Sequence, residues 1–191
     1  IASWLANLST IVLARGDDKR AQTLCEESLA IRKTLGYTGG CAHTLAILGR
    51  LSEAETIYAR LFDQVNLINP DGKFDMSVIE ARPETVSAYL EWGVATHAVG
   101  LELKDDGRLD RAKQIYERIL ANTTTDQRLW WQAKFSQIKL LSDRGDYDNA
   151  DTAIQSVKRT TDPQYDKGRF GFKDKFLSLE AELSKKVFRK K

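Results

Sequence analysis

The chain has 191 residues, of which 42% are hydrophobic and 29% are charged, and its formal net charge is +2. This composition is typical of a folded protein and excludes disordered, collagen-like and low-complexity chains. Charged residues interrupt every apolar run before it reaches the ~20 residues of a membrane-spanning helix. We therefore expect no membrane partner.

A short pattern recurs four times along the chain, with a glycine five residues before an alanine. Glycine ends a helix readily because it adopts positive φ. An apolar or aromatic residue four positions past each alanine predicts an amphipathic helix after the glycine. The predicted unit is therefore helix, glycine turn, helix. The pairs are Gly16–Ala21, Gly49–Ala54, Gly107–Ala112 and Gly145–Ala150, followed by Cys25, Tyr58, Tyr116 and Ile154.

This pattern resembles the tetratricopeptide repeat family. The resemblance is carried by Gly49, Leu51, Ala54 and Tyr58 and their counterparts. The 33 residues from Gly16 to Gly49 are close to the family's period of ~34. The aromatic and glycine usual early in the first helix of each repeat are mostly replaced. The resemblance implies an all-α, right-handed α-hairpin solenoid of about four helical hairpins plus a C-terminal capping helix, in a single domain over residues 1–191.

Turn signals and periodicity set the remaining boundaries. The segment Asn69–Gly72 reads Asn-Pro-Asp-Gly, which predicts a turn inside an insert. Pro83 marks the start of the next helix, which should reach about Lys104. An irregular stretch with Pro163 and Gly168 should precede the capping helix. We expect repeats at about 2–34, 35–66, 84–122 and 126–162, the insert at about 66–83 and the capping helix at about 172–188. The capping helix carries one apolar face, formed by Phe172, Phe176, Leu179, Leu183 and Val187.

Capping residues predict where the second helix of each hairpin begins. Ser52, Asp110 and Asp148 each follow a turn glycine by three residues, where a side-chain oxygen can accept an unpaired helix amide. The segment from Ser52 to Glu55 also fits a capping box. In the first repeat Asp17 or Asp18 can replace this cap.

The sequence offers little for catalysis or metal binding. His43 and His97 are the two histidines, and Cys41 with His43 supplies two metal ligands where a stable site needs more. We expect packing roles for Cys41 and His43, with no metal, no cofactor and no enzymatic activity. Cys25 and Cys41 lie on helices expected to adjoin, where buried reduced thiols are favoured over a disulfide. At most one of Trp130 and Trp131 can face a groove, because adjacent helical residues point in different directions.

The family resemblance also implies a binding surface. In tetratricopeptide repeats the first helices line a concave groove that receives a peptide or protein. Counting from each turn glycine implies Ala6, Thr10, Gly39 and His43 as groove positions in the first two repeats. An aromatic side chain and two lysines would suit an extended, somewhat acidic peptide, although Leu101 and Phe135 can instead pack against their neighbours. The groove positions implied in the last two repeats are His97, Leu101, Lys104, Phe135, Lys139 and Ser142.

The function expected is a non-catalytic protein- or peptide-binding module. Ala6 and Thr10 stand where chaperone-binding members carry a lysine and an asparagine, so chaperone tails are not the expected partner. Residues 158–191 hold 11 basic and 5 acidic side chains, which leaves nucleic-acid binding as an alternative. A second alternative is an effector-sensing arm of a signalling protein, because residues 24–33 are similar to repeats of bacterial regulators. The chain begins with Ile1 and has no signal-peptide pattern, so we expect a cytoplasmic fragment of a larger multidomain protein.

Overall fold

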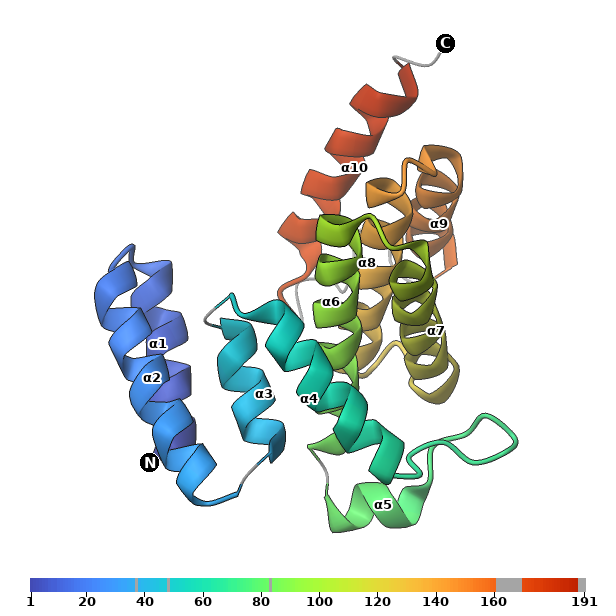
Figure 1. The fold of residues 1–191 in the computed structure, drawn as a ribbon. Coiled ribbons are helices and arrows are strands. Elements are labelled where there is room, and N and C mark those ends of the chain that lie inside the picture. Colours follow the sequence, from blue (N-terminus) through green and yellow to red (C-terminus); the bar gives the residue numbers. More distant parts are fainter. Residues whose placement is uncertain (37, 48, 83, 161–169, 189–191) are drawn as a thin grey trace. The chain divides into compact units, whose positions relative to one another are not determined.

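The structure is a computed structural model. It describes residues 1–36, 38–47, 49–82, 84–160 and 170–188. The helices of this part of the chain are joined by turns and short irregular segments, one of which contains an isolated antiparallel bridge between Ile68 and Phe74 (Figure 1). The all-α prediction is confirmed, and the right-handed sense of the solenoid stays a prediction. The helices are α1 (Ala2–Ala14), α2 (Asp18–Thr34), α3 (Thr38–Ile47), α4 (Leu51–Gln64), α5 (Met76–Ala81), α6 (Thr85–Leu103), α7 (Asp106–Asn122), α8 (Arg128–Asp143), α9 (Tyr147–Thr160) and α10 (Lys173–Phe188).

The helices form two compact units, Ile1–Arg108 and Leu109–Lys191. The helix pairs α1/α2, α3/α4, α6/α7 and α8/α9 begin and end close to the four predicted repeats. The grouping of all four repeats into a single domain stays a prediction. Pro83, Pro163 and Gly168 lie outside the described residues.

In the first unit, each helix packs against its successor in the array. Contacts join α1 to α2, α2 to α3, α3 to α4 and α4 to α6. The alanines of the repeat pattern lie at these contacts, since Ala21 is 4% exposed and Ala54 is fully buried. Cys25 and Tyr58, one helical turn further on, are buried as well. The small residue lets neighbouring helices approach, and the larger one fills the space beside it.

In the second unit, α10 covers α8 and α9, as expected of the capping helix. Phe172, Phe176, Leu179 and Leu183 are each at most 4% exposed. They pack with Trp131 and Ile138 of α8 and with Ile154 and Val157 of α9. Trp131 is buried and Trp130 is half-buried, which agrees with one core tryptophan. The side chain of Val187 lies outside the described part.

Four turns between consecutive helices contain the same type of backbone hydrogen bond. In each, an N–H reaches back five residues to a carbonyl, the 6→1 bond of a Schellman turn. The residue before that N–H has positive φ: +82° at Gly16, +74° at Gly49, +77° at Gly145 and +54° at Lys104. The bonds are Asp17 to Val12 (3.3 Å), Arg50 to Leu45 (2.9 Å), Asp105 to Gly100 (2.9 Å) and Asp146 to Leu141 (2.9 Å).

The third turn corrects a prediction. Gly107 was expected to end the preceding helix, but it lies in the first turn of α7 and Lys104 holds the left-handed position. The helix α7 therefore has an extra turn before its buried Leu109 and Ala112. The turn falls three residues before Gly107, and Leu103, the last residue of α6, is 58% exposed.

The predicted caps at Ser52, Asp110 and Asp148 are also wrong. Each second helix begins two residues after the left-handed residue, so these three side chains lie inside α4, α7 and α9. The N-cap of α4 is Arg50, without a side-chain cap bond, so the capping box does not form. Asp17 does cap α2, accepting from the Arg20 N–H at 3.2 Å.

The expected turn in the insert is present. Gly72 has a φ of +81°, and its N–H donates to the Asn69 carbonyl at 2.9 Å. The short helix α5 follows and was not predicted. Asp75 caps it by accepting from the Ser77 N–H at 2.9 Å. In the described ranges, no helix combines the length and the apolar character needed to cross a bilayer.

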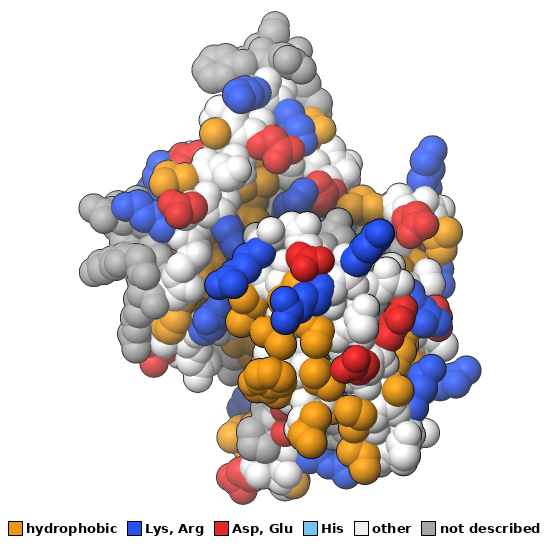
Figure 2. All heavy atoms as spheres, turned by 90° about the vertical axis from the view of Figure 1, so that its left-hand side faces the viewer, with side chains coloured by type: hydrophobic (Ala, Val, Ile, Leu, Met, Phe, Trp, Pro, Cys, Tyr) orange, Lys and Arg blue, Asp and Glu red, His pale blue; other side chains and the backbone are white. Residues whose placement is uncertain are grey.

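The helix α1 exposes large hydrophobic side chains. Its thirteen residues include no charged side chain, and Trp4 and Ile11 are 65% and 53% exposed. Figure 2 views the molecule from the side on which α1 and α2 lie in Figure 1, and hydrophobic side chains gather there in one patch.

Candidate functional site

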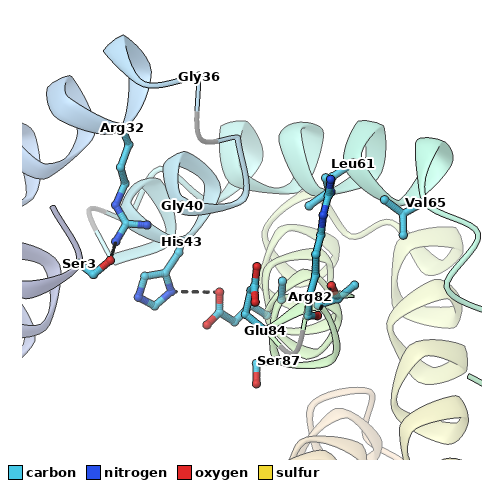
Figure 3. Close-up of a pocket in the computed structure, with 13 residues that line it drawn as sticks. Ser3, Arg32, Gly36, Gly40, His43, Leu61, Val65, Arg82, Glu84 and Ser87 are labelled. Carbon is cyan, nitrogen blue, oxygen red and sulfur yellow. Dashed lines mark hydrogen bonds and ion pairs between the residues drawn. The ribbon is translucent and has the colours of Figure 1, made fainter. Parts of the chain in front are cut away.

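A cavity of about 520 Å³ lies in the first unit (Figure 3). Helices α1, α2, α3, α4 and α6 contribute to its wall, together with the turns beside them. Leu61, Val65 and Ala88 supply apolar lining. The polar and charged lining residues are Ser3, Arg32, His43, Arg82, Glu84, Thr85, Ser87 and Glu91.

Arg32 brings a positive charge to the cavity wall. It lies in the last turn of α2, where the partial negative charge of the helix end favours a cation. Its side chain is buried, at 5% exposure, and is hydrogen-bonded within the fold. Its Nε donates to the Ser28 hydroxyl at 3.2 Å and its Nη2 donates to the Ser3 hydroxyl at 3.4 Å. Ser28 in turn donates to the Ala2 carbonyl at 2.9 Å. The guanidinium is therefore held between α1 and α2.

Glu91 of α6 is the centre of a second polar cluster. It accepts from the Tyr58 hydroxyl of α4 at 2.5 Å and lies 3.0 Å from Nδ1 of His43 in α3. Burial alone would raise the pKa of Glu91, but the hydrogen bonds from His43 and Tyr58 and the charge of Arg32 outweigh it and lower the pKa. Burial and the nearby Glu91 carboxylate raise the pKa of Tyr58. Glu91 therefore stays ionised and Tyr58 stays protonated at neutral pH.

The arrangement suits recognition of a polar chain. The cavity presents a fixed cation at Arg32, an anion at Glu91, and the charged Arg82 and Glu84 nearby, where Figure 3 shows their side chains. A cavity of a few hundred Å³ with convergent polar groups is typical of a binding site. Within the described ranges, no three side chains among His, Cys, Asp and Glu gather closely enough to hold a metal ion.

His43 has a different role from the packing role predicted for it. Its side chain is 36% exposed, lines the cavity and pairs with Glu91. Its neighbour Cys41 is 7% exposed and does pack, in the cluster that holds Leu29. Counting back from the turn glycine did imply His43 as a groove residue. No sequence pattern indicated Arg32 or Glu91, because these two residues belong to different repeats.

Three of the predicted groove residues lie in the first unit, outside the cavity lining. His97 is buried at 8% exposure, and Leu101 is 38% exposed. Lys104 is exposed and forms the left-handed end of α6. These positions are therefore not equally accessible to a partner.

The other three lie on α8 in the second unit. Phe135 is half-buried, with its ring edge-on to Phe176 at 5.5 Å between centroids. Lys139 binds Asp143 at 2.7 Å, and Ser142 is 1% exposed. That the six residues implied in the last two repeats form a peptide-binding groove stays a prediction.

The two cysteines are free and buried in the first unit. The Cys25 thiol donates to the Ser9 hydroxyl at 2.9 Å. Burial raises the pKa of the Cys41 thiol, against the opposing charges of Lys33 and Arg32. Both side chains are therefore reduced packing residues, as expected.

Residues 1–37 match a family model described as tetratricopeptide repeat. Comparisons with curated proteins and with solved structures give no match. The matched segment contains the hairpin α1/α2, which contributes Ser3 and Arg32 to the cavity.

Proposed function

We propose that this chain, whose first 37 residues match a tetratricopeptide repeat model, is a non-catalytic interaction module that holds an extended peptide of a protein partner in the cavity of its first unit. Repeats of this family are protein-interaction modules, which supports the general role. The cavity supports the more specific one, because its volume of about 520 Å³ is in the range of binding sites for small ligands and short peptide segments.

The observation that carries the proposal is the buried Arg32 guanidinium at the cavity wall. Arginine keeps its charge at any pH that a folded protein tolerates, so Arg32 attracts a carboxylate to this wall of the cavity. Arg82 adds a second, exposed cation to the lining. The negative charge of Glu91 is already engaged by His43 and Tyr58. The preferred occupant is therefore a peptide that directs an aspartate or glutamate toward Arg32.

A random peptide library displayed on phage, selected against the full chain, tests this proposal. We expect the selected peptides to be enriched in aspartate and glutamate. Fluorescence anisotropy with a labelled selected peptide then compares variants. Arg32→Met should weaken binding by about tenfold or more, because a charge-assisted hydrogen-bonded pair is lost.

Two further variants keep this test decisive. Arg82→Met removes an exposed cation from the lining and should weaken binding by about threefold without affecting folding. Arg60→Met makes the same change at an exposed residue of α4 outside the lining and should leave affinity unchanged. Selected peptides without acidic enrichment, or equal binding by all three variants, would overturn the proposal. Tight binding of RNA or DNA that falls steeply with salt would instead favour the basic C-terminal end as the working surface.

A further inference from the structure

Glu91 keeps one of its two carboxylate oxygens open to the cavity. The Tyr58 hydroxyl and Nδ1 of His43 both lie against the same oxygen, Oε2, at 2.5 Å and 3.0 Å. Among the described residues, no hydrogen-bond donor reaches the other oxygen, Oε1. The side chain of Glu91 lines the cavity and is 38% exposed, so the carboxylate is open to solvent from the cavity.

A ligand that fills the cavity has to replace this solvent. Binding against the wall at Glu91 displaces water from Oε1, and an ionised carboxylate that loses water without gaining a donor costs free energy. Tyr58 is a neutral donor, so its hydrogen bond leaves the negative charge of Glu91 in place. A positively charged donor would satisfy Oε1 and compensate the charge together, and its hydrogen bond is stronger than that of a neutral donor.

The charges of the whole lining also favour a ligand with both signs of charge. Two arginines, Arg32 and Arg82, are balanced by two glutamates, Glu84 and Glu91. Glu84 is the N-cap of α6, but its side chain makes no cap hydrogen bond, and Figure 3 shows it at the cavity. A purely acidic ligand would therefore meet two carboxylates as well as two arginines, and repulsion and desolvation would cost affinity.

We propose that Glu91 is a specificity-determining residue that binds a lysine or arginine side chain of the peptide. This inference rests on the proposed function and extends it, because the preferred peptide then carries a basic residue in addition to the acidic residue that faces Arg32. Both Arg32 and Glu91 line one cavity of about 520 Å³, so a short segment spans the two. Glu84 lies two helical turns before Glu91 on the same face of α6 and adds a weaker attraction, because it is exposed.

The phage selection on the full chain reads the two requirements separately. Enrichment of aspartate and glutamate reports the proposed function, and enrichment of lysine and arginine in the same peptides reports the role of Glu91. We expect both. Peptides enriched in acidic residues alone would overturn the role of Glu91 and leave the proposed function standing. Peptides without acidic enrichment would overturn the proposed function, on which this role rests.

Paired peptides assign the basic preference to one residue. One peptide is a selected sequence, and the other has its basic residue replaced by methionine. Fluorescence anisotropy gives the ratio of their dissociation constants, which should be about tenfold in favour of the basic peptide for the wild type. Glu91→Gln should reduce this ratio to about twofold or less. Because an unfolded fraction weakens both peptides equally, the ratio does not depend on the stability of the variant.

Three controls complete the test. In Glu91→Gln, the preference for the acidic residue of the peptide should persist, measured with a peptide in which glutamine replaces that residue. Glu84→Gln should reduce the basic preference by about half, since the charge that it removes is exposed. Glu102→Gln, at an exposed residue of α6 outside the lining, should leave it unchanged. A tenfold basic preference that survives in Glu91→Gln, or that falls equally in Glu102→Gln, would refute the assignment.

Discussion

Tyr58 of α4 donates a 2.5 Å hydrogen bond to Glu91 of α6 and so links the second and third repeats within the first unit. The repeat pattern selects an aromatic residue at this position for packing, and Tyr58 is indeed fully buried. Its hydroxyl has a separate task, since it orients a carboxylate of the cavity lining. The ring of Tyr58 therefore contributes to packing, and its hydroxyl contributes to the polar lining of the cavity by holding Glu91.

Removal of this hydroxyl should cost stability without leaving a cavity. Tyr58→Phe keeps the ring and loses the hydrogen bond, while Glu91 keeps His43 and partial contact with water. We expect the free energy of unfolding to fall by about 1 kcal/mol, measured by urea denaturation followed by circular dichroism. Equal stability of Tyr58→Phe and wild type would contradict the role of the bond.

Acid should weaken the first unit partly through Glu91. A carboxyl whose pKa is lower in the folded state adds stability above its unfolded pKa, and this contribution is lost as pH falls through the folded pKa. Glu91→Gln should therefore be less stable than wild type near neutral pH, and the gap should narrow below about pH 4.5. Urea denaturation at several pH values measures the gap. Glu80→Gln, at an exposed residue of α5, should differ little from wild type throughout, and a constant gap for Glu91→Gln would argue against this contribution.

The turn at Lys104 should accept glycine with a gain in stability. Its φ of +54° costs an ordinary L-residue about 1 kcal/mol, which glycine avoids. Lys104→Gly should therefore raise the free energy of unfolding by about that amount. Gly49→Ala is the reciprocal test, because an added Cβ meets no atom within 4 Å there and the loss of about 1 kcal/mol would be conformational alone. Thermal or urea unfolding measures the stability of both variants. A lower free energy of unfolding for Lys104→Gly would contradict a conformational cost of positive φ at Lys104.

Phe135 should affect stability more than a pure groove residue would. Its ring packs edge-on against Phe176 and lies beside the core of the second unit. Because Phe135 is half-buried, Phe135→Ala should lower the free energy of unfolding by about 2 kcal/mol, below the ~3–5 kcal/mol of a fully buried aromatic. Phe135→Leu, which keeps most of the apolar volume, should lose less than half as much. Unchanged stability in Phe135→Ala would leave the groove role as the better explanation.

Much of the fold could be predicted because repeat packing is local in sequence. Gly16, Gly49 and Gly145 mark turns whose conformation few other residues adopt, and Ala21 and Ala54 mark close helix contacts. These requirements act within one hairpin, so a single sequence carries them. The stripe of the capping helix could be predicted for the same reason.

The failures have identifiable physical causes. Gly107 matched the spacing to Ala112, yet Lys104 accepted the left-handed conformation and the helix started earlier. The side chains of Ser52 and Asp148 cannot cap their helices because each of these helices begins two residues after the turn glycine, which places Ser52 and Asp148 inside its first turn.

The cavity could not be predicted for another reason. It depends on the juxtaposition of Arg32, His43 and Glu91 from three helices, which no spacing within one repeat encodes.

The burial of both native cysteines has a practical consequence. In the folded chain Cys25 and Cys41 are 1% and 7% exposed, so aqueous maleimides and spin labels would reach them slowly. A single cysteine introduced on the surface could then carry a dye or a nitroxide without removal of the natural thiols. The rate at which those two become labelled would report how often the first unit opens.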